Sequence, residues 1–375
     1  MSDIAEPLSA WDILRVTFPS LSPESGAGTT EIKPVCVIHQ GKEPRWIILG
    51  NPRKALQVLR SWKPWNPGSR LRWNVMILAT SAGVLPRLPG IVNLQARIDS
   101  RYWRMSLADL GENWNAVIHI GGPSHTRKAI LFFLGEDHQV DFVAKAPLMH
   151  AAAGAILNET SILPRMKDTM CVPRILFQDS RRGIAVQSWL EGNPVSRRFT
   201  DAHVHLLSLL VNPHCKTRVS DRCMDIAAML DQVDLPLDRP LLSQALELLR
   251  FDELLPEFVE HRDFAPWNLK WLGRNCLGLL DWEWSVPNGL PWQDICRFFY
   301  IQDALFHGPG KVWQEMSKNR LLQTYREQFG LSSSALRALT MHYLLRVLCT
   351  DWQNGNTRMA LYVFRQIKSL LHPNQ

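Results

Sequence analysis

The sequence of 375 residues lacks an apolar stretch long enough to cross a lipid bilayer. The longest uncharged apolar run, residues 73–86, is short and has an arginine on either side. The N-terminal residues include acids and contain no apolar segment of the kind found in secretory signals. We therefore expect a soluble, cytoplasmic protein with no transmembrane segment.

The cysteines also lack a spacing pattern that would indicate disulfide pairing. There are seven Cys, an odd number, and no CxxC pattern. This usage is typical of reduced thiols in an intracellular protein and not of a disulfide framework. The nearest approach to a metal cluster, His214 and Cys215 with Cys223, has no second ligand pair, so we expect no metal there.

The net charge of +7 is unevenly distributed along the chain. Residues 41–130 hold 14 Lys/Arg against 4 Asp/Glu, whereas the rest of the chain holds 28 against 31. Such a segment could meet a polyanion, an acidic membrane surface or a phosphate-bearing ligand. Its basic residues are spaced singly, which favours a solvated face. Because no nucleic-acid-binding motif is present, nucleic acid is not an expected partner.

The pattern of apolar residues divides the chain into three segments. Residues 20–32 predict a flexible linker, and strands at 33–40 and 44–50 with helices at 52–62 and 69–83 predict a small α/β module within residues 1–110. Residues 111–192 predict the order β–β–β–α–β–β, with the helix over about 148–166. Residues 193–375 predict a mainly helical region, so the fold class is α+β.

The stretch EHRDFAPWNLKW, residues 260–271, has the residue types that phosphoryl transfer requires. An enzyme that transfers a phosphoryl group must orient the acceptor hydroxyl group and neutralise charge on the phosphates. Asp263 and Asn268, five residues apart, supply a base and an oxygen ligand for Mg²⁺ from one loop. Asp281 follows an apolar run 13 residues after Asn268, a separation that suits a β-hairpin carrying both ligands at one end. Glu283 either lines the acceptor or metal site or forms a structural salt bridge.

Residues 114–160 contain candidate residues for binding a nucleotide. Gly121 and Gly122 lie between two predicted strands, where the lack of Cβ lets backbone approach phosphates, although a plain hairpin turn has the same composition. Ser124 could donate to a phosphate oxygen. Lys145 lies on an apolar strand, where a lone ammonium is costly, and Glu159 on the next helix is its natural partner.

The order GGPSHT, FVAKAP, NETSIL, HRDFAPWN and LLDWEW resembles the aminoglycoside phosphotransferase/choline kinase family, small-molecule relatives of protein kinases. The resemblance covers about residues 112–370. It implies a bilobal protein-kinase-like fold, with a small antiparallel β-sheet lobe and a larger helical lobe. Residues 1–110 would then be an extra N-terminal module.

The resemblance also implies roles for the residues that match. Asp263 would be the catalytic base, and Asn268 and Asp281 would bind Mg²⁺. Lys145 and Glu159 would form the pair that holds the ATP phosphates.

Supporting roles follow from the same resemblance. His261 would brace the loop, and Arg262 stands where the family often has glycine. The segment QSWLEG, with Gln187 and Trp189, matches the part of the family that pairs with adenine. Asp294, outside the motif, is expected to cap or brace the helix in which it lies.

The sequence thus predicts an ATP- and Mg²⁺-dependent kinase acting on a hydroxyl of a sugar, an amino sugar or an amino alcohol. A second possibility is a catalytically silent kinase-like module that binds a partner through its basic segment. A third is an antibiotic-modifying aminoglycoside phosphotransferase, which shares the chemistry and differs in its acceptor.

Overall fold

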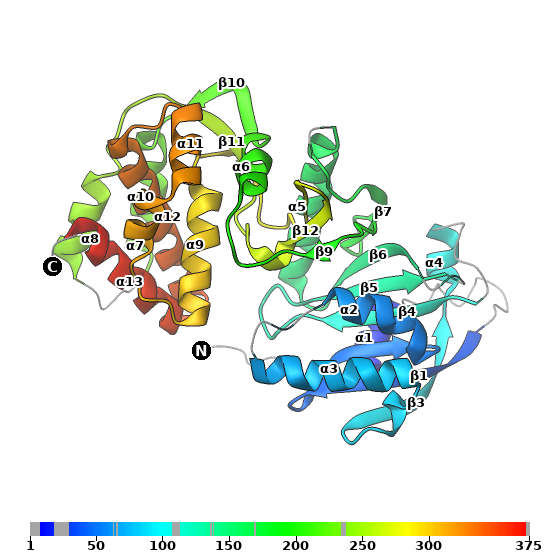
Figure 1. The fold of residues 1–375 in the computed structure, drawn as a ribbon. Helices are drawn as coiled ribbons and strands as arrows, with labels where there is room; N and C mark the ends of the chain where they lie inside the picture. Colours follow the sequence, from blue (N-terminus) through cyan, green and yellow to red (C-terminus); the bar gives the residue numbers. More distant parts are fainter. Residues whose placement is uncertain are drawn as a thin grey trace. The chain divides into compact units, whose positions relative to one another are not determined.

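The computed structural model describes residues 8–18, 30–62, 64, 67–106, 113–135, 137, 139–168, 170–233 and 238–372. The chain forms two compact units, Met1–Pro194 and Val195–Gln375. Figure 1 shows the elements of each unit coloured along the sequence.

The first unit is built on an eight-stranded antiparallel sheet with the strand order β3-β1-β2-β4-β5-β6-β8-β7. Its strands are β1 (Thr30–Gln40), β2 (Glu43–Leu49), β3 (Ile91–Asp99), β4 (Asn115–Ile120), β5 (Lys128–Leu134), β6 (Val140–Pro147), β7 (Ile175–Asp179) and β8 (Ile184–Ser188). The N-terminal strands β1–β3 therefore continue the sheet of the segment that carries Lys145. A two-residue strand, β9 (Asn193–Pro194), ends the unit.

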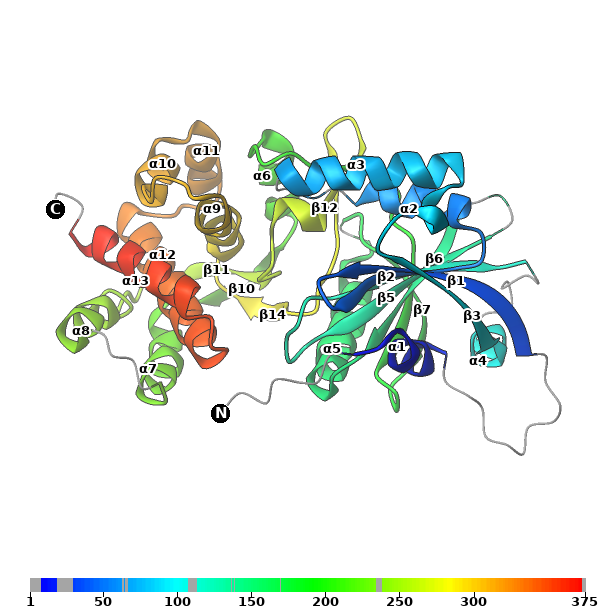
Figure 2. The ribbon, with the colours of Figure 1, turned by 90° about the horizontal axis from the view of Figure 1, so that it is seen from below.

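Helices cover both faces of this sheet because its strands are apolar on both sides. The helices are α1 (Ala10–Thr17), η1 (Pro52–Ala55), α2 (Leu56–Ser61), α3 (Pro67–Ala82), η2 (Leu85–Arg87), α4 (Arg101–Ser106) and α5 (His150–Met166). Ile47 and Ile118 pack in one core cluster with Ile13 of α1. Trp46, on the opposite face, packs in a second cluster with Met76 of α3. In Figure 2 α3 and α1 lie on opposite sides of the sheet.

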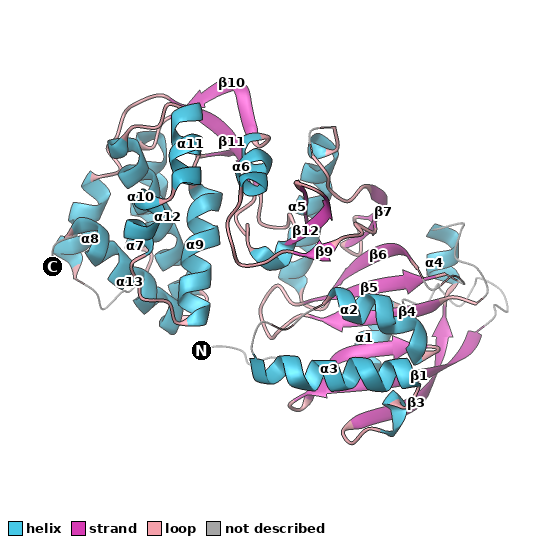
Figure 3. Cartoon of the chain, viewed as in Figure 1, coloured by secondary structure: helices cyan, strands magenta, loops and turns pink. Residues whose placement is uncertain are grey.

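The second unit is mainly helical (Figure 3). Its helices are α6 (Asp201–Ser208), η3 (Ser220–Arg222), α7 (Cys223–Asp231), α8 (Arg239–Glu247), η4 (Pro266–Asn268), α9 (Gln293–Phe306), α10 (Val312–Lys318), α11 (Arg320–Gln328), α12 (Ser333–Gln353) and α13 (Thr357–Leu371). Its strands are β10 (Val211–Thr217), β11 (Leu255–Glu260) and β14 (Val286–Gly289) in one sheet, with β12 (Leu269–Gly273) and β13 (Cys276–Leu279) forming a hairpin. Helix α12 is buried on nearly all sides, as the central helix of an α-helical core must be.

The α+β class predicted from the sequence is confirmed, as are the strands on either side of the glycine turn. Differences are local. Strands β3, β10 and β11 and helix α1 were not predicted. Helices α10 and α11 are separated at Asn319, whose side chain accepts a hydrogen bond from Leu321 N and caps the second. In the predicted linker 20–32, residues 20–29 lie outside the described residues and 30–32 begin β1.

Within the described ranges, no helix combines the length and the apolar character that a bilayer span requires.

Candidate active site

The loop with Asp263 lies between strand β11 and the short helix η4. Pro266 is the first residue of η4, where its fixed φ suits the turn and its missing N–H is not needed. The backbone N–H of Asn268 donates to Ala265 O at 2.9 Å and closes the turn. As a result Asp263 and Asn268 lie on the same side of a single tight loop.

Both carboxylate oxygens of Asp263 are held by side chains. Asn268 Nδ2 donates to Asp263 Oδ2 at 2.8 Å and to its carbonyl oxygen at 2.9 Å. Arg297, on α9, donates to Oδ1 from Nη2 at 2.7 Å and from Nε at 3.1 Å. Burial opposes the charge on Arg297, but the adjacent carboxylate of Asp263 outweighs it and raises the pKa of the guanidinium. The carboxylate is thus fixed in orientation by one amide and one cation.

His261 braces the loop from inside, as the sequence predicted. It is completely buried, its Nε2 lies 2.9 Å from Leu280 O, and its Nδ1 accepts from Asp263 N at 3.2 Å. Because Nδ1 accepts a hydrogen bond, we assign the ring proton to Nε2, which then donates to Leu280. The imidazole therefore links the loop with Asp263 to the segment that leads into Asp281.

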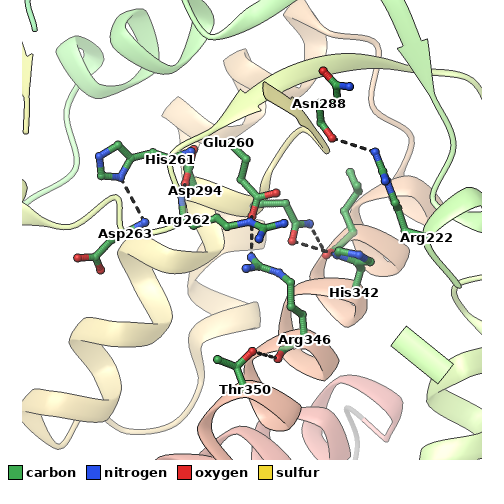
Figure 4. Close-up of polar contacts among 12 residues, drawn as sticks. Arg222, Glu260, His261, Arg262, Asp263, Asn288, Asp294, His342, Arg346 and Thr350 are labelled. Atoms are coloured by element: carbon green, nitrogen blue, oxygen red, sulfur yellow. Dashed lines mark hydrogen bonds and ion pairs between the residues drawn. The ribbon is translucent and has the colours of Figure 1, made fainter. Parts of the chain in front are cut away.

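Asp294 makes different hydrogen bonds from those expected of a residue that caps its own helix. Its oxygens do not cap α9; they accept the backbone N–H groups of His261 and Arg262, each at 2.8 Å (Figure 4). Burial, followed by the charge of Glu260, raises the pKa of Asp294 to about 7. The residue ties the loop to the start of α9, and the sequence alone pointed only to its structural character.

Beneath the loop lies a buried ionic network. Glu260 is 3% exposed and pairs with Arg346 Nη2 at 2.6 Å and Arg262 Nε at 3.4 Å. Arg262 has a φ of 67°, in the left-handed region that non-glycine residues seldom adopt. Asp294 and Glu260 hold it there, so backbone strain is concentrated immediately before Asp263. His342, buried nearby, has its pKa lowered to about 3 by burial and by the charges of the surrounding arginines.

The predicted hairpin after the loop is present. Leu269 pairs with Leu279, and Leu280 N donates to Asn268 O at 2.8 Å. Asp281 follows directly, with a φ of 65°. The register therefore places Asn268 and Asp281 at the same end of the hairpin. Glu283 is half-buried two residues further on.

The donor set at this end of the hairpin suits Mg²⁺ better than a transition metal. It consists of one amide oxygen and one carboxylate, and the described residues contain no cluster of three or more His, Cys, Asp or Glu able to hold a metal. Mg²⁺ is commonly held by one or two carboxylates together with substrate phosphates and water. With Asn268 Nδ2 engaged by Asp263, the amide keeps Oδ1 as its metal-binding atom.

In the first unit, the predicted ion pair between Lys145 and Glu159 is present. Lys145 Nζ lies 2.8 Å from Glu159 Oε1 and 2.6 Å from Oε2, with the two side chains 5% and 1% exposed. Lys145 lies in the middle of β6 and Glu159 on α5. A buried pair of this kind requires that both charges be present.

Gln187 lies on the same face of the sheet as Lys145. The register pairs Lys145 with Ala185 and Val143 with Gln187, and residues two apart on a strand share a face. Among the described residues, Gln187 Oε1 and Trp189 Nε1 are buried polar atoms with no hydrogen-bond partner. Buried polar groups are normally satisfied, so an acceptor and a donor in the predicted adenine segment fit a missing polar ligand.

The glycine turn joins β4 and β5, with Gly121 N donating to Lys128 O at 3.0 Å. Arg127 Nε donates to Gly121 O at 3.0 Å and is itself paired with Glu43 at 2.9 Å. Ser124 is exposed in the turn. Arg127 fixes this turn, a role for which the sequence carries no signal.

The structure therefore divides the predicted site residues between the two units and groups them within each. Those of the first unit are Gly121, Gly122, Ser124, Lys145, Glu159, Gln187 and Trp189; those of the second are His261, Arg262, Asp263, Asn268, Asp281 and Glu283. A cavity of about 1060 Å³ in the first unit, lined by residues such as Lys33, Asn51 and Asn115, includes none of them.

Arg297 is the most important site residue that the sequence did not reveal. It lies 34 residues after Asp263 and three after Asp294, so one turn of α9 carries both an anchor for the loop and a partner for the carboxylate. A helical residue at that spacing has no signal in the sequence unless Asp294 has first been recognised as an anchor.

Comparison with solved structures identifies the fold of the chain. No protein-family model matches the sequence, and no curated protein matches it either. Among solved structures, the chain has the kinase-like fold of the aminoglycoside phosphotransferases.

The individual structures are distant in sequence. The crystal structure of aminoglycoside phosphotransferase APH(4)-Ia matches with a TM-score of 0.52 and 11% identity, covering 74% of this chain and 98% of its own. A thermostable mutant of that protein, in a ternary complex with AMP-PNP and hygromycin B, matches with a TM-score of 0.52 and 11% identity, covering 73% of this chain and 97% of its own. At this identity the likeness establishes the fold.

Proposed function

We propose that the protein is an ATP-dependent phosphotransferase that phosphorylates a hydroxyl group of a small polar molecule. The observation that carries the proposal is the fixed carboxylate of Asp263. Asn268 and Arg297 hold its two oxygens, and Asp294 anchors the loop on which it lies. Preorganised groups of this kind act by positioning, which is most of what phosphoryl transfer asks of a protein.

Asp263 acts on the acceptor. Its carboxylate accepts the proton of the acceptor hydroxyl as the oxygen attacks the γ-phosphorus of ATP. The bond from that phosphorus to the β-phosphate oxygen breaks, and ADP leaves. The bonds from Asn268 and Arg297 keep the carboxylate aligned during this exchange.

The first unit binds the nucleotide in this proposal. Lys145, held by Glu159, binds the phosphates, and the backbone at Gly121 and Gly122 approaches them with Ser124. The unsatisfied atoms of Gln187 and Trp189 would pair with the base.

Asn268 and Asp281 would hold Mg²⁺, with Glu283 close by in the sequence. The ion supplies charge neutralisation on the phosphates and orients them. The protein contributes the strained backbone at Asp281 and the hairpin register that brings Asp281 to the same end of the hairpin as Asn268.

The acceptor belongs to the class of sugars, amino sugars and amino alcohols, and the enzyme acts in the cytoplasm. Solved structures with the same fold were determined with nucleotides and with hygromycin B, which supports a polar, hydroxyl-rich acceptor. Antibiotic aminoglycosides form one arm of the test.

The test is ADP release from Mg·ATP across a panel of sugars, amino sugars, choline-like alcohols and aminoglycosides. We expect one class to stimulate release by the wild type and not by Asp263→Asn. Equal stimulation of the two proteins would contradict the assignment of Asp263. No stimulation by any acceptor, together with no nucleotide binding, would contradict the proposed function.

A second candidate, a catalytically silent binding module, is favoured by one observation. Val143, two residues before Lys145 on the same sheet face, packs in a core cluster with Val58 and Leu59 of α2 and Met76 of α3. These helices thus cover part of the face that would meet the nucleotide. Calorimetric titration with Mg·ATP separates the candidates, because tight binding without turnover for every acceptor supports the silent module.

A further inference from the structure

Helix α3 presents an exposed apolar stripe on its outward side. Leu71 is 69% exposed, Val75 51% and Leu78 69%. Their spacing of four and three residues places them along one side of the helix. Met76 and Ala79 on the other side are buried, and Met76 packs against the sheet. The helix is therefore apolar on two sides, and packing within the unit accounts for only one of them.

Arginines border the exposed stripe. Each residue turns an α-helix by about 100°, so Arg70 and Arg72 lie on opposite flanks of Leu71. Arg70 Nε donates to Pro64 O at 2.9 Å, which holds that side chain beside the start of the helix. Arg72 is exposed. At its N-terminal end the apolar stripe thus has a guanidinium group on each side, as helices that lie in a membrane interface often do.

The stretch of sequence that contains α3 carries charges of one sign. Residues 44–98 contain nine Lys/Arg and no Asp/Glu. Arg60 on α2 and Arg87 on η2 are exposed on neighbouring elements. A segment so free of acids attracts an anionic surface and repels a basic one.

We infer that α3 docks on an anionic lipid surface, with Leu71, Val75 and Leu78 entering the boundary between headgroups and acyl chains. The guanidinium groups of Arg70 and Arg72 would pair with lipid phosphates, because arginine places its apolar stem along the bilayer and its charge at the headgroups. The stripe is a convex row of aliphatic side chains, which suits a deformable planar surface better than a shaped protein pocket.

This inference does not depend on the proposed phosphotransferase activity, since none of its residues belongs to the candidate active site. The test uses the full chain in a vesicle flotation assay at low salt. One set of vesicles is phosphatidylcholine, and the other contains equal parts of phosphatidylcholine and phosphatidylglycerol. We expect binding to the anionic vesicles only, decreasing as salt screens the charges.

The decisive variant is Leu71→Ser with Leu78→Ser. Because both side chains are exposed, the double variant should fold normally, and its thermal unfolding checks this. Its binding to anionic vesicles should fall by about tenfold or more, as expected from removing two aliphatic side chains from an apolar contact. Leu176→Ser, at a leucine of β7 that is 45% exposed, is the matched control and should bind like the wild type. Arg72→Gln should weaken binding to anionic vesicles by a smaller factor.

Three outcomes would overturn the inference. The first is equal binding of the wild type to both kinds of vesicle, or binding to neither. The second is binding of the double variant as strong as that of the wild type. The third is a dimer, detected by analytical ultracentrifugation, that the double variant loses while vesicle binding is absent; the stripe then contacts a second copy of the chain.

Discussion

The two units stabilise their buried charged side chains in different ways. In the first, Lys145 and Glu159, 14 residues apart in the sequence, form a direct two-oxygen ion pair. In the second, charged groups form a network whose members are distant in sequence: Asp263 and Arg297 are 34 residues apart, and Glu260 and Arg346 are 86 apart. The pair joins a strand to the next helix, whereas the network joins the loop with Asp263 to α9 and α12.

The difference has physical consequences. A buried pair fails when either partner is removed, because the remaining charge stays in a medium that cannot solvate it. In the second unit, the carboxylate of Asp263 has a hydrogen-bond partner on each oxygen, so loss of one partner leaves the other in place. We therefore expect substitutions in the pair to affect stability and nucleotide binding, and substitutions around Asp263 to affect mainly turnover.

The largest effect is expected at the centre of the network. Asp263→Asn should lower kcat by about a thousandfold or more, because the amide cannot accept the hydroxyl proton while the loop stays in place. Steady-state ADP release gives kcat, and calorimetry should show nucleotide affinity close to that of the wild type. Asp225→Asn, at an exposed aspartate of α7, is the control. A fully active Asp263→Asn protein would show that this carboxylate does not accept the hydroxyl proton.

Breaking the pair comes next. Glu159→Ala leaves the ammonium of Lys145 buried without the carboxylate and should lower the free energy of unfolding by about 3–5 kcal/mol. Chemical denaturation measures the loss, with Glu191→Ala, at an exposed position of the same unit, as control. The double variant Lys145→Met with Glu159→Leu should recover much of the stability but not nucleotide binding. A double variant no more stable than Glu159→Ala would show that the lone charge is not the cause.

The same contrast explains how far the sequence could predict the structure. The pair could be predicted because Lys145 and Glu159 lie on consecutive elements with clear apolar patterns, as do the strands beside them. The hairpin could be predicted because 13 residues separate Asn268 and Asp281, and one turn closes that distance. In these cases local periodicity and short spacing carry the signal.

The network could not be predicted, because its contacts join residues far apart in the chain. Asp294 looked like a helix cap from its position, and only the fold brings His261 N and Arg262 N to its oxygens. Arg297 had no signal for the same reason. Strand β3 was missed because it is a sheet-edge strand with only two of its nine residues buried, which leaves a weak apolar pattern.

A smaller effect tests the cation in the network. Arg297→Met should lower kcat by about tenfold to a hundredfold with little change in KM for ATP, because the carboxylate loses one of its two holders. Arg297→Lys should recover part of the loss, since lysine keeps the charge but not the fork. Added guanidinium should raise the turnover of Arg297→Ala.

A double-mutant cycle separates positioning from general support of the fold. If Arg297 acts through Asp263, Arg297→Met should cost little more in the Asp263→Asn background, so the two effects should not add. Additive losses, together with an unfolding temperature lowered in proportion, would assign Arg297 a purely structural role.

The smallest effect concerns pH. Burial and then the charges of Arg346, Arg262 and Arg222 lower the pKa of His342 to about 3 from an ordinary 6.5. Between these two pKa values, the imidazole of His342 is protonated in the unfolded chain and neutral in the folded chain. Its contribution to the free energy of unfolding is therefore fully present above pH 6.5 and is lost as pH falls toward 3. Asp294, whose pKa burial raises to about 7, acts in the opposite direction, so its contribution to stability is lost as pH rises.

His342→Asn should therefore flatten the decline in unfolding free energy below pH 6.5, although not abolish it, because His203 has its pKa lowered by burial to about 4. Denaturation curves at several pH values measure the slope, with His205→Asn, at an exposed histidine of α6, as control. An unchanged slope in His342→Asn would mean that burial and the neighbouring arginines do not keep this imidazole neutral.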